Sequence, residues 1–297
     1  MKQTNRFTRV ISFLITAIMV VGMVPFAVFA DAPMPSDMTA LSDKETTLAP
    51  GITQNEIVIL DKNGGRVEMF IATADMNVDT VGIQSSYVGA QCENYGMAKM
   101  TEQVAAHQAK YEARGEQYTA IVGMNGSYYN MTTGQPTGAF IMEGVDGKGA
   151  NANNYPFFAI LKDGTPYIGA KGEFNTMKDQ IWETVGANEV LVWDGVNTYP
   201  STDTAKYPRS AVGITADNKV IFINANGNKG TASVGLTRYE LGQLFVELGC
   251  VRAYNMDGGD SSVMTFNDSI YSRPSGGGRS LGDILFICDP DSAEETE

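Results

Sequence analysis

The sequence predicts an α+β protein, with a strand-rich mixed sheet and a few helices in a single domain. Short β-prone runs such as "EIVIL" and "KVIFIN" are separated by Gly, Asn and Asp residues. Helical periodicity is confined to two segments. No internal repeat is present, and residues 52–290, about 240 residues, have the length of one large domain.

Residues 1–30 are predicted to be a signal peptide outside the fold. Lys2, Arg6 and Arg9 form a basic start, residues 10–29 are almost wholly apolar, and the segment ending at Ala30 offers a cleavage site. An uncleaved membrane anchor is the alternative, because the apolar run approaches the length of a spanning helix. We expect a secreted or cell-surface protein that contacts a membrane only through this signal, if the signal stays uncleaved.

Two polar segments flank the predicted domain. Residues 31–51 carry three prolines and no sustained periodicity, and we predict that they form a linker. Residues 291–297 are predicted to be an acidic tail.

The strand pattern contains two tight connections. The triplet "DNK" (217–219) separates two apolar runs, and "KDGTP" (162–166) follows "FFAIL". Both carry Asp, Asn or Gly at turn positions, so each predicts a β-hairpin.

The first helix is predicted over residues 97–114, with Gly115 as its stop signal. His107, the single histidine of the chain, is expected at its surface. The residues that share one face of this helix are Met97, Met100, Val104 and Tyr111.

The second helix has stronger end signals. Thr237 and Glu240 have the spacing of a capping box, and Gly249 provides a stop. The run "VRAYNM" that follows reads as a strand, so Asp257 stands where this strand gives way to a loop. The apolar positions between the two signals are Leu241, Leu244, Phe245 and Leu248.

Charge and cysteine content exclude several classes. Without residues 1–30 the chain has 18 Lys and Arg against 34 Asp and Glu, a net charge near −16, so nucleic acid is not an expected partner. Cys92, Cys250 and Cys288 allow at most one disulfide, and whether Cys250 pairs with Cys288 stays open. With one histidine and no Cys-x-x-Cys, neither a zinc site nor a Ser-His-Asp triad is expected. The sequence does not give the oligomeric state.

Four segments concentrate polar and glycine residues. They are "NGSYYNMTTGQPTGAFIMEG" (125–144), "YPRSAVGI" (207–214), "YNMDGGDSSVM" (254–264) and "SRPSGGGRSLGDILFI" (272–287). In this order and spacing, over residues 120–288, they resemble the phosphodiester glycosidase family. Ser127 and Asp260 depart from the family pattern, because each replaces a glycine. The resemblance implies a hydrolase that cleaves the C1–O bond of a sugar-1-phosphodiester in a glycan, a cell-wall polymer or an exopolysaccharide.

This chemistry needs a carboxylate near C1 of the sugar and cations or N–H donors around the departing phosphate oxygens. Asp257 can supply the carboxylate, Arg209 the charge, and Glu143 a second carboxylate, so these three are the predicted catalytic residues. The predicted substrate- or phosphate-binding residues are Asn125, Gly126, Gly258, Gly259, Asp260, Ser261, Arg273 and Arg279.

Several alternatives stay open at this level. Asp257 could brace its own turn through an Asx hydrogen bond. No cofactor is predicted and no metal ligand is assigned, although Asp260 with Asp257 and Asn125 could bind calcium. Tyr128 and Tyr129 could stack on a sugar or pack in the core. A glycan-binding or exopolysaccharide-assembly protein that retains the fold without catalysis is the alternative function.

Overall fold

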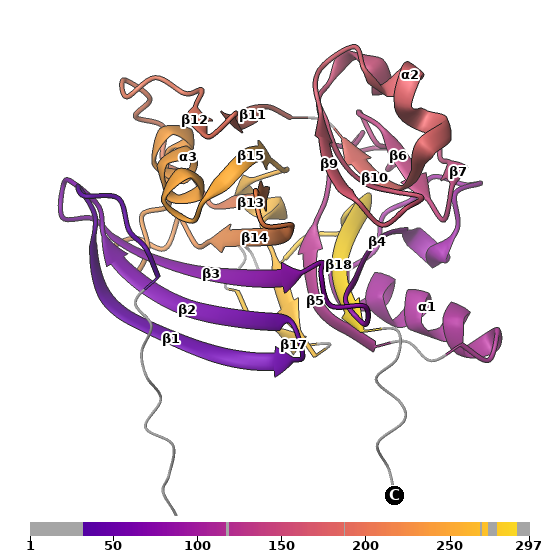
Figure 1. Ribbon diagram of the computed structural model, residues 1–297, viewed down its shortest axis with the longest axis horizontal. Coiled ribbons are helices and arrows are strands. Elements are labelled where there is room, and N and C mark those ends of the chain that lie inside the picture. Colours follow the sequence, from indigo (N-terminus) through magenta and orange to yellow (C-terminus); the bar gives the residue numbers. More distant parts are fainter. Residues whose placement is uncertain (1–31, 117–118, 187, 268, 273–277, 290–297) are drawn as a thin grey trace, which may run out of the picture.

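The computed structural model describes residues 32–116, 119–186, 188–267, 269–272 and 278–289 (Figure 1). The predicted signal peptide, Arg273 and the acidic tail 291–297 lie outside these residues. Strands predominate and few helices are present among these residues, as predicted. The prediction of one mixed sheet is corrected in two respects, because the described strands form three sheets and every strand pair among them is antiparallel.

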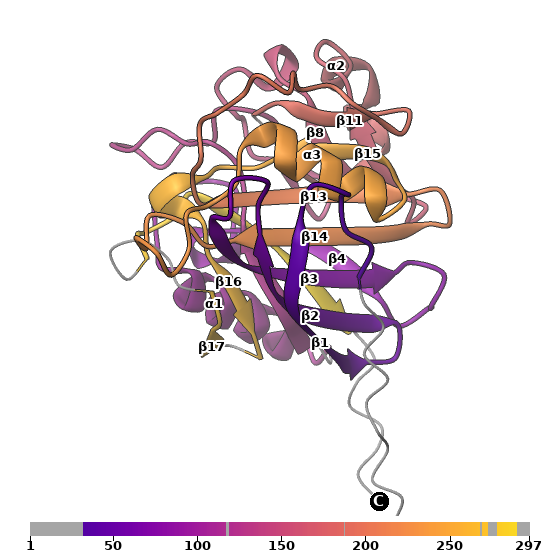
Figure 2. The same cartoon turned by 90° about the vertical axis from the view of Figure 1, so that its left-hand side faces the viewer.

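The first sheet is the largest and has eight strands. In spatial order they are β1 (Thr39–Ala49), β2 (Ile52–Leu60), β3 (Arg66–Asp75), β14 (Lys219–Ala225), β13 (Arg209–Thr215), β15 (Cys250–Asn255), β11 (Val190–Trp193) and β12 (Val196–Asn197). Helix α3 (Arg238–Glu247) lies across one face of this sheet (Figure 2). It buries Leu241, Leu244 and Phe245 there, three of the four apolar positions predicted from the sequence, and the fourth, Leu248, is partly buried against the same cluster.

The other two sheets have five strands each. The second is β17 (Ser269–Ile270), β16 (Met264–Phe266), β5 (Thr119–Asn125), β18 (Asp283–Asp289) and β4 (Gly82–Tyr87). The third is β7 (Val145–Asp146), β6 (Phe140–Met142), β10 (Ile181–Gly186), β8 (Phe157–Leu161) and β9 (Pro166–Gly169). The remaining helices are α1 (Met100–Ala113), α2 (Phe174–Met177) and the single turns η1 (Val88–Ala90), η2 (Ala152–Asn154), η3 (Lys178–Gln180) and η4 (Gly259–Ser261).

One hydrophobic core joins all three sheets. Phe222 and Tyr254 contribute from the first sheet, Leu285 from the second, and Phe140 and Phe158 from the third. Helix α1 covers the outer face of the second sheet, where it packs on β18 (Figure 1). A continuous core of this kind makes the described chain a single domain, as predicted.

The two predicted hairpin turns and the predicted capping box are confirmed. The hairpins β13–β14 and β8–β9 turn at the predicted positions, with Asn218 at φ 65° and Gly164 at φ 85°. The hydroxyl of Thr237 accepts a hydrogen bond from the backbone N–H of Glu240, and the Glu240 carboxylate accepts one from the backbone N–H of Thr237. This is the predicted capping box.

The predicted linker over residues 31–51 is wrong for most of its length. Residues 39–49 form β1, which pairs along β2 and turns through Pro50 and Gly51 at φ 75°. As an edge strand it buries only Asp43 among its eleven residues. It therefore lacks the alternation of apolar and polar residues by which a half-buried strand is recognised.

His107 is the second correction, because it is buried rather than at the surface. Its side chain packs between Tyr111 and Phe286, and its Nε2 lies 2.8 Å from Oε1 of Gln84. Burial lowers the pKa of His107 to about 3, so the imidazole is neutral at ordinary pH. Cys250 and Cys288 belong to different core clusters and are both free thiols. No helix in the described part of the chain is long and apolar enough to cross a membrane.

Candidate active site

Asp257 lies two residues beyond the end of β15, in a loop held by the neighbouring sheet. Its backbone N–H donates to the carbonyl of Gly126 at 3.0 Å, and its carbonyl accepts a hydrogen bond from Nδ2 of Asn125 at 2.8 Å. The Oδ1 atom of Asn125 accepts from the Ser210 hydroxyl and the Val263 N–H. These bonds join the ends of β5, β13 and β15, so the position of Asp257 is fixed by the junction of two sheets.

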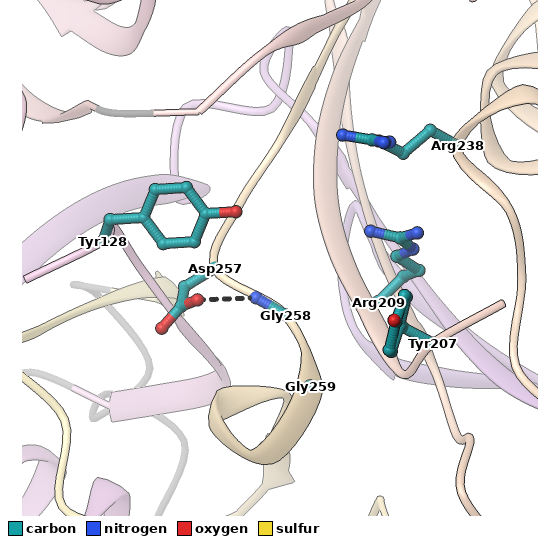
Figure 3. A pocket seen from close by; sticks show the side chains of 7 residues that line it. All are labelled: Tyr128, Tyr207, Arg209, Arg238, Asp257, Gly258 and Gly259. Carbon is teal, nitrogen blue, oxygen red and sulfur yellow. Dashed lines mark hydrogen bonds between the residues drawn. The ribbon is translucent and has the colours of Figure 1, made fainter. Parts of the chain in front are cut away.

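The Asp257 side chain lines a cavity of about 270 Å³ (Figure 3). Asp257 and Tyr128 form one side of this cavity, and Arg209, Arg238 and Tyr207 face them from the other side. The complete set of lining residues is Tyr128, Tyr207, Arg209, Arg238, Asp257, Gly258 and Gly259. A carboxylate opposite two guanidinium groups is the defining feature of this space.

Arg209 is buried and rigidly held. Its Nε donates to the carbonyl of Leu236 at 3.0 Å and its Nη2 to that of Ala205 at 2.9 Å, while the guanidinium lies over the ring of Tyr207. Burial and the nearby charge of Arg238 lower the pKa of Arg209, which nevertheless stays protonated because a guanidinium titrates far above neutral pH. Its hydrogen bonds among the described residues go to carbonyl oxygens, so its charge can bind an anion in the cavity.

Arg238 is a lining residue that the sequence analysis missed. It is the first residue of α3, and its Nη1 lies 2.6 Å from Oε2 of Glu189. The guanidinium lies over the ring of Tyr199, 4.9 Å from its centroid, and its Nε is 3.6 Å from Oδ2 of Asp203. The helix dipole disfavours a cation in the first turn of a helix. The position of Arg238 in the first turn of α3 was therefore the one sequence signal that could have identified it as a candidate site residue.

The pKa of the Asp257 carboxyl group is raised toward neutral pH. Burial raises its pKa to about 6, although the Ser261 hydroxyl, the Gly258 N–H and the charge of Arg279 each act to lower it. The Gly258 N–H donates directly to Oδ1 of Asp257 at 2.8 Å. This bond goes to the next residue, whereas an Asx turn bonds the N–H two residues on, and the Gly259 N–H donates to Pro208 instead; the Asx turn considered as an alternative is therefore not formed.

Gly258 and Gly259 bring the backbone of this loop to the cavity wall. Gly259 has φ 62°, a conformation that favours glycine, and its N–H donates to the carbonyl of Pro208 at 3.0 Å. This bond ties the Asp257 loop to the segment that leads into Arg209. Ser261 is buried in the same loop, where its hydroxyl lowers the pKa of Asp257.

Arg279 and Asp260 lie beside the cavity rather than in its lining. Nη2 of Arg279 is 3.2 Å from Oδ2 of Asp260, and both side chains are substantially exposed. In the described part of the chain, no three His, Cys, Asp or Glu side chains are grouped so that they could hold a metal ion. Of the three side chains that could bind calcium, Asp260 pairs with Arg279 and Asn125 accepts hydrogen bonds from Ser210 and Val263, whereas Asp257 faces the cavity.

The structure does not bring Glu143 to Asp257. Glu143 occupies the turn between β6 and β7 with φ 50°, and its carboxylate contacts Lys110, Tyr111 and Arg114. It lines a separate cavity of about 220 Å³ next to α1. No described contact links it to the arginine-lined cavity.

The two tyrosines of the first motif have different environments. Tyr128 is 41% exposed and lines the cavity, so it is placed to contact a ligand. Tyr129 is buried, and its hydroxyl donates to the carbonyl of Ser280. Gly126 and Ser127 do not line the cavity, and the Ser127 hydroxyl accepts a hydrogen bond from the Gly186 N–H. Asn125, predicted to bind substrate, has its amide committed to protein groups.

Comparison with known proteins assigns the family. A family model described as phosphodiester glycosidase matches residues 118–288, more than half of the chain. The chain therefore belongs to the phosphodiester glycosidase family, and the resemblance seen in its four motifs is confirmed.

Two individual proteins are similar to the chain in sequence. It is 27% identical over 191 residues to the SPbeta prophage-derived uncharacterized protein YomE of Bacillus subtilis, covering 58% of this chain and 28% of that protein. It is 25% identical over 176 residues to N-acetylglucosamine-1-phosphodiester alpha-N-acetylglucosaminidase of Mus musculus, covering 52% of this chain and 33% of that protein. The chain thus spans a third or less of the length of these relatives.

Two solved structures share the fold. The zebrafish N-acetylglucosamine-1-phosphodiester alpha-N-acetylglucosaminidase catalytic domain, auto-inhibited by its pro-peptide, matches with a TM-score of 0.64 at 19% identity, over 83% of this chain and 88% of that one. A hypothetical protein from Synechocystis matches with a TM-score of 0.64 at 13% identity, over 84% of this chain and 64% of that one. At these identities the likeness establishes the fold.

Proposed function

We propose that this protein is an exported hydrolase that cleaves the C1–O bond of a sugar-1-phosphodiester. The observation that carries the proposal is the cavity in which Asp257 faces Arg209 and Arg238, in a chain of the phosphodiester glycosidase family. A sugar-1-phosphodiester has the matching halves: a carbon that becomes cationic and a leaving group that is anionic.

The arrangement of charges gives the substrate a direction in the cavity. The phosphate group lies against Arg209 and Arg238, because two guanidinium groups can bind its oxygens in a bidentate manner. The sugar ring lies against Tyr128, and its C1 faces Asp257. A sugar in this position is bounded by an exposed aromatic ring and a carboxylate, which are the groups that contact carbohydrate rings and oxocarbenium-like transition states.

The proposed reaction needs Asp257 in its ionised form. As the C1–O bond lengthens, the carboxylate stabilises positive charge at C1, either by direct attack or by activating a water molecule. Negative charge grows on the departing phosphate oxygen, which the fixed guanidinium of Arg209 meets without reorganisation. A phosphate monoester leaves readily as an anion, so the reaction depends less on a strong general acid than ordinary glycoside hydrolysis does.

Export and the nature of the polymer are further parts of the proposal. The basic start and apolar run of residues 1–30 support export, either into the medium or to the cell surface. Outside the cell, a phosphate-containing glycan such as a cell-wall polymer or an exopolysaccharide is the partner class that suits the cavity. The acidic composition of the chain disfavours nucleic acid as a partner.

The test is turnover of a panel of sugar-1-phosphodiesters, including N-acetylglucosamine-1-phosphodiesters, followed by phosphorus NMR. We expect conversion of a diester signal into a phosphate monoester signal by the wild-type protein and not by Asp257→Asn. A folded wild-type protein that converts no member of the panel would contradict the proposal.

One observation favours a second candidate function, a glycan-binding protein without catalysis. Asp257 is the single carboxylate among the described residues that line the cavity, whereas ordinary glycosidases use two. Calorimetry with the same panel separates the two functions. Binding without any product after long incubation would support the second one.

A further inference from the structure

A second carboxyl group, Asp283, lies next to Asp257 but does not line the cavity. Asp283 is the first residue of β18 and is only 1% exposed. The Gly126 N–H donates to the carbonyl of Asp283 at 3.0 Å, and the Gly126 carbonyl accepts from the Asp257 N–H at 3.0 Å. Gly126 therefore stands between the two aspartates, with one backbone hydrogen bond to each.

The side chain of Asp283 holds the next residue of the same loop. Its Oδ1 accepts a hydrogen bond from the Ser127 N–H at 2.5 Å, whereas its Oδ2 is buried without a hydrogen-bond partner among the described residues. A Cβ atom at Gly126 would lie 2.1 Å from Oδ1 of Asp283, so only glycine permits this contact. The carboxyl group is thus packed directly against the loop that carries Tyr128.

The surroundings of Asp283 favour its un-ionised form. The ionisable groups that face it are Asp257, Tyr87 of β4 and Tyr254 of β15, and no Lys or Arg among the described residues forms an ion pair with it. An unpaired carboxylate in a buried site is costly, because its solvation by water is lost without replacement.

We propose that Asp283 is a positioning residue for hydrolysis at Asp257, which holds the Gly126–Ser127 segment in place while its own carboxyl group carries a proton. The inference rests on the proposed function, since it concerns the same cavity. Asp283 is too deeply buried to touch a substrate. It acts through Gly126 and Ser127. Gly126 holds the Asp257 backbone by a hydrogen bond, and Ser127 sets the position of the next residue, Tyr128, which lines the cavity. Loss of its proton would put a second negative charge beside Asp257 and disturb that arrangement.

The protonation states follow a definite order with pH. Burial, assisted by the charge of Asp257, raises the pKa of Asp283 to about 7, whereas that of Asp257 is about 6. The working form, with Asp257 ionised and Asp283 protonated, therefore peaks between these values and declines on both sides. Two groups coupled in this way produce a bell-shaped profile of kcat/KM.

The first arm of the experiment compares kcat/KM of the wild type and Asp283→Asn between pH 4 and pH 9. The amide keeps an oxygen that accepts from the Ser127 N–H, but it cannot ionise. We expect Asp283→Asn to retain the acid limb near pH 6 and to lose the alkaline decline, so that at pH 8 it exceeds the wild type by roughly tenfold. Gly126→Ala, which crowds the same contact, should lower kcat at every pH.

The second arm does not depend on activity and follows the unfolding of both proteins over the same pH range. An acid whose pKa is higher in the folded than in the unfolded state binds more protons when folded. Wild-type stability should therefore fall as pH rises from about 4 to about 7, whereas this contribution is absent from Asp283→Asn. The melting temperature of the variant should accordingly rise relative to the wild type across this interval and level off above it.

The outcomes are separable. Parallel stability curves would show that Asp283 holds no proton and would overturn the proposal. Diverging stability curves with superimposable kcat/KM profiles would make the proton purely structural and would also overturn it. Absence of turnover by the wild type would overturn the proposed function and the role of Asp283 in it, while the stability curves would still report the proton on Asp283.

Discussion

Glu143 and Asp257 are carboxylates that the sequence suggests as a pair and that the fold places in opposite electrostatic environments. At Glu143, burial alone would raise the pKa, but hydrogen bonds from Arg114, Lys110 and Tyr111 outweigh it and lower the pKa to about 2. The carboxylate is ionised at all ordinary pH values and its charge is fully neutralised by its neighbours.

At Asp257 the balance is reversed, because burial outweighs the hydrogen bonds and raises the pKa to about 6. The arginines of this cavity face the carboxylate across open space and form no ion pair with it among the described residues. A carboxylate surrounded by its own cations, as at Glu143, stabilises the fold. A carboxylate separated from Arg209 by a cavity leaves its own charge and that of Arg209 available for a ligand with two differently charged halves, while Arg238 is already paired with Glu189.

The most severe test of this comparison is Asp257→Asn. If the carboxylate stabilises charge at C1, turnover should fall by about 10²- to 10⁴-fold. The free energy of unfolding should stay within about 1 kcal/mol of the wild type, because Asp257 does not contribute an ion pair to the fold. Turnover assays and denaturant unfolding check both halves. Near-normal turnover would remove Asp257 from the mechanism.

The pH dependence of the wild type gives the next largest effect. Asp257 must lose its proton to act, so kcat/KM should rise tenfold per pH unit below its pKa of about 6 and then approach a maximum. The pH profile of kcat/KM for the free enzyme measures this directly. An acid limb near pH 2, the range of the Glu143 carboxyl group, would instead assign the essential carboxylate to Glu143.

Arg209→Lys tests the cationic wall of the cavity. A lysine keeps the charge but loses the planar fork that two carbonyl oxygens now hold in place, so kcat/KM should fall roughly 10- to 100-fold, mostly in kcat. Arg279→Lys is the matched control, because Arg279 pairs with exposed Asp260 outside the cavity lining and should change kcat/KM by less than about fivefold. Equal effects of the two substitutions would contradict this placement of the phosphate.

Glu143→Gln should have the smallest effect on catalysis and a clear effect on stability. Removing the charge that Lys110 and Arg114 contact should cost about 1–3 kcal/mol of unfolding free energy. The kcat/KM value should change by less than about threefold, since the two sites are independent. The group has a depressed pKa, so its contribution is present above pH 4.5 and lost as pH falls toward 2. Wild-type and variant stabilities should therefore converge in acid, as measured by unfolding across pH. A large loss of turnover without loss of stability would contradict this assignment.

Local signals made much of the fold predictable. The hairpin at Asn218 and the capping box of Thr237 and Glu240 are set by turn and cap chemistry within a few residues, and the structure contains both. Strand β1 was not predictable in the same way. It is recognised through its pairing with β2, a long-range contact that leaves no periodic pattern on an exposed edge strand.

The same difference between local signals and long-range contacts applies to the candidate site. Asp257 and Arg209 were predictable because each stands in a distinctive local motif at the end of a strand. Arg238 was not, because it enters the cavity through the placement of α3 against the first sheet. Glu143 was misleading, since it belongs to the first segment, residues 125–144, but lies in a turn that directs its side chain toward α1.

The most direct test of the central claim is hydrolysis of an accepted sugar-1-phosphodiester in water enriched with oxygen-18. If Asp257 promotes cleavage of the C1–O bond, the bridging oxygen leaves with the phosphate and the label enters the sugar. Phosphorus NMR should then show a phosphate monoester at its unlabelled chemical shift. A monoester resonance displaced by oxygen-18 bound to phosphorus would show attack at phosphorus and would contradict the account.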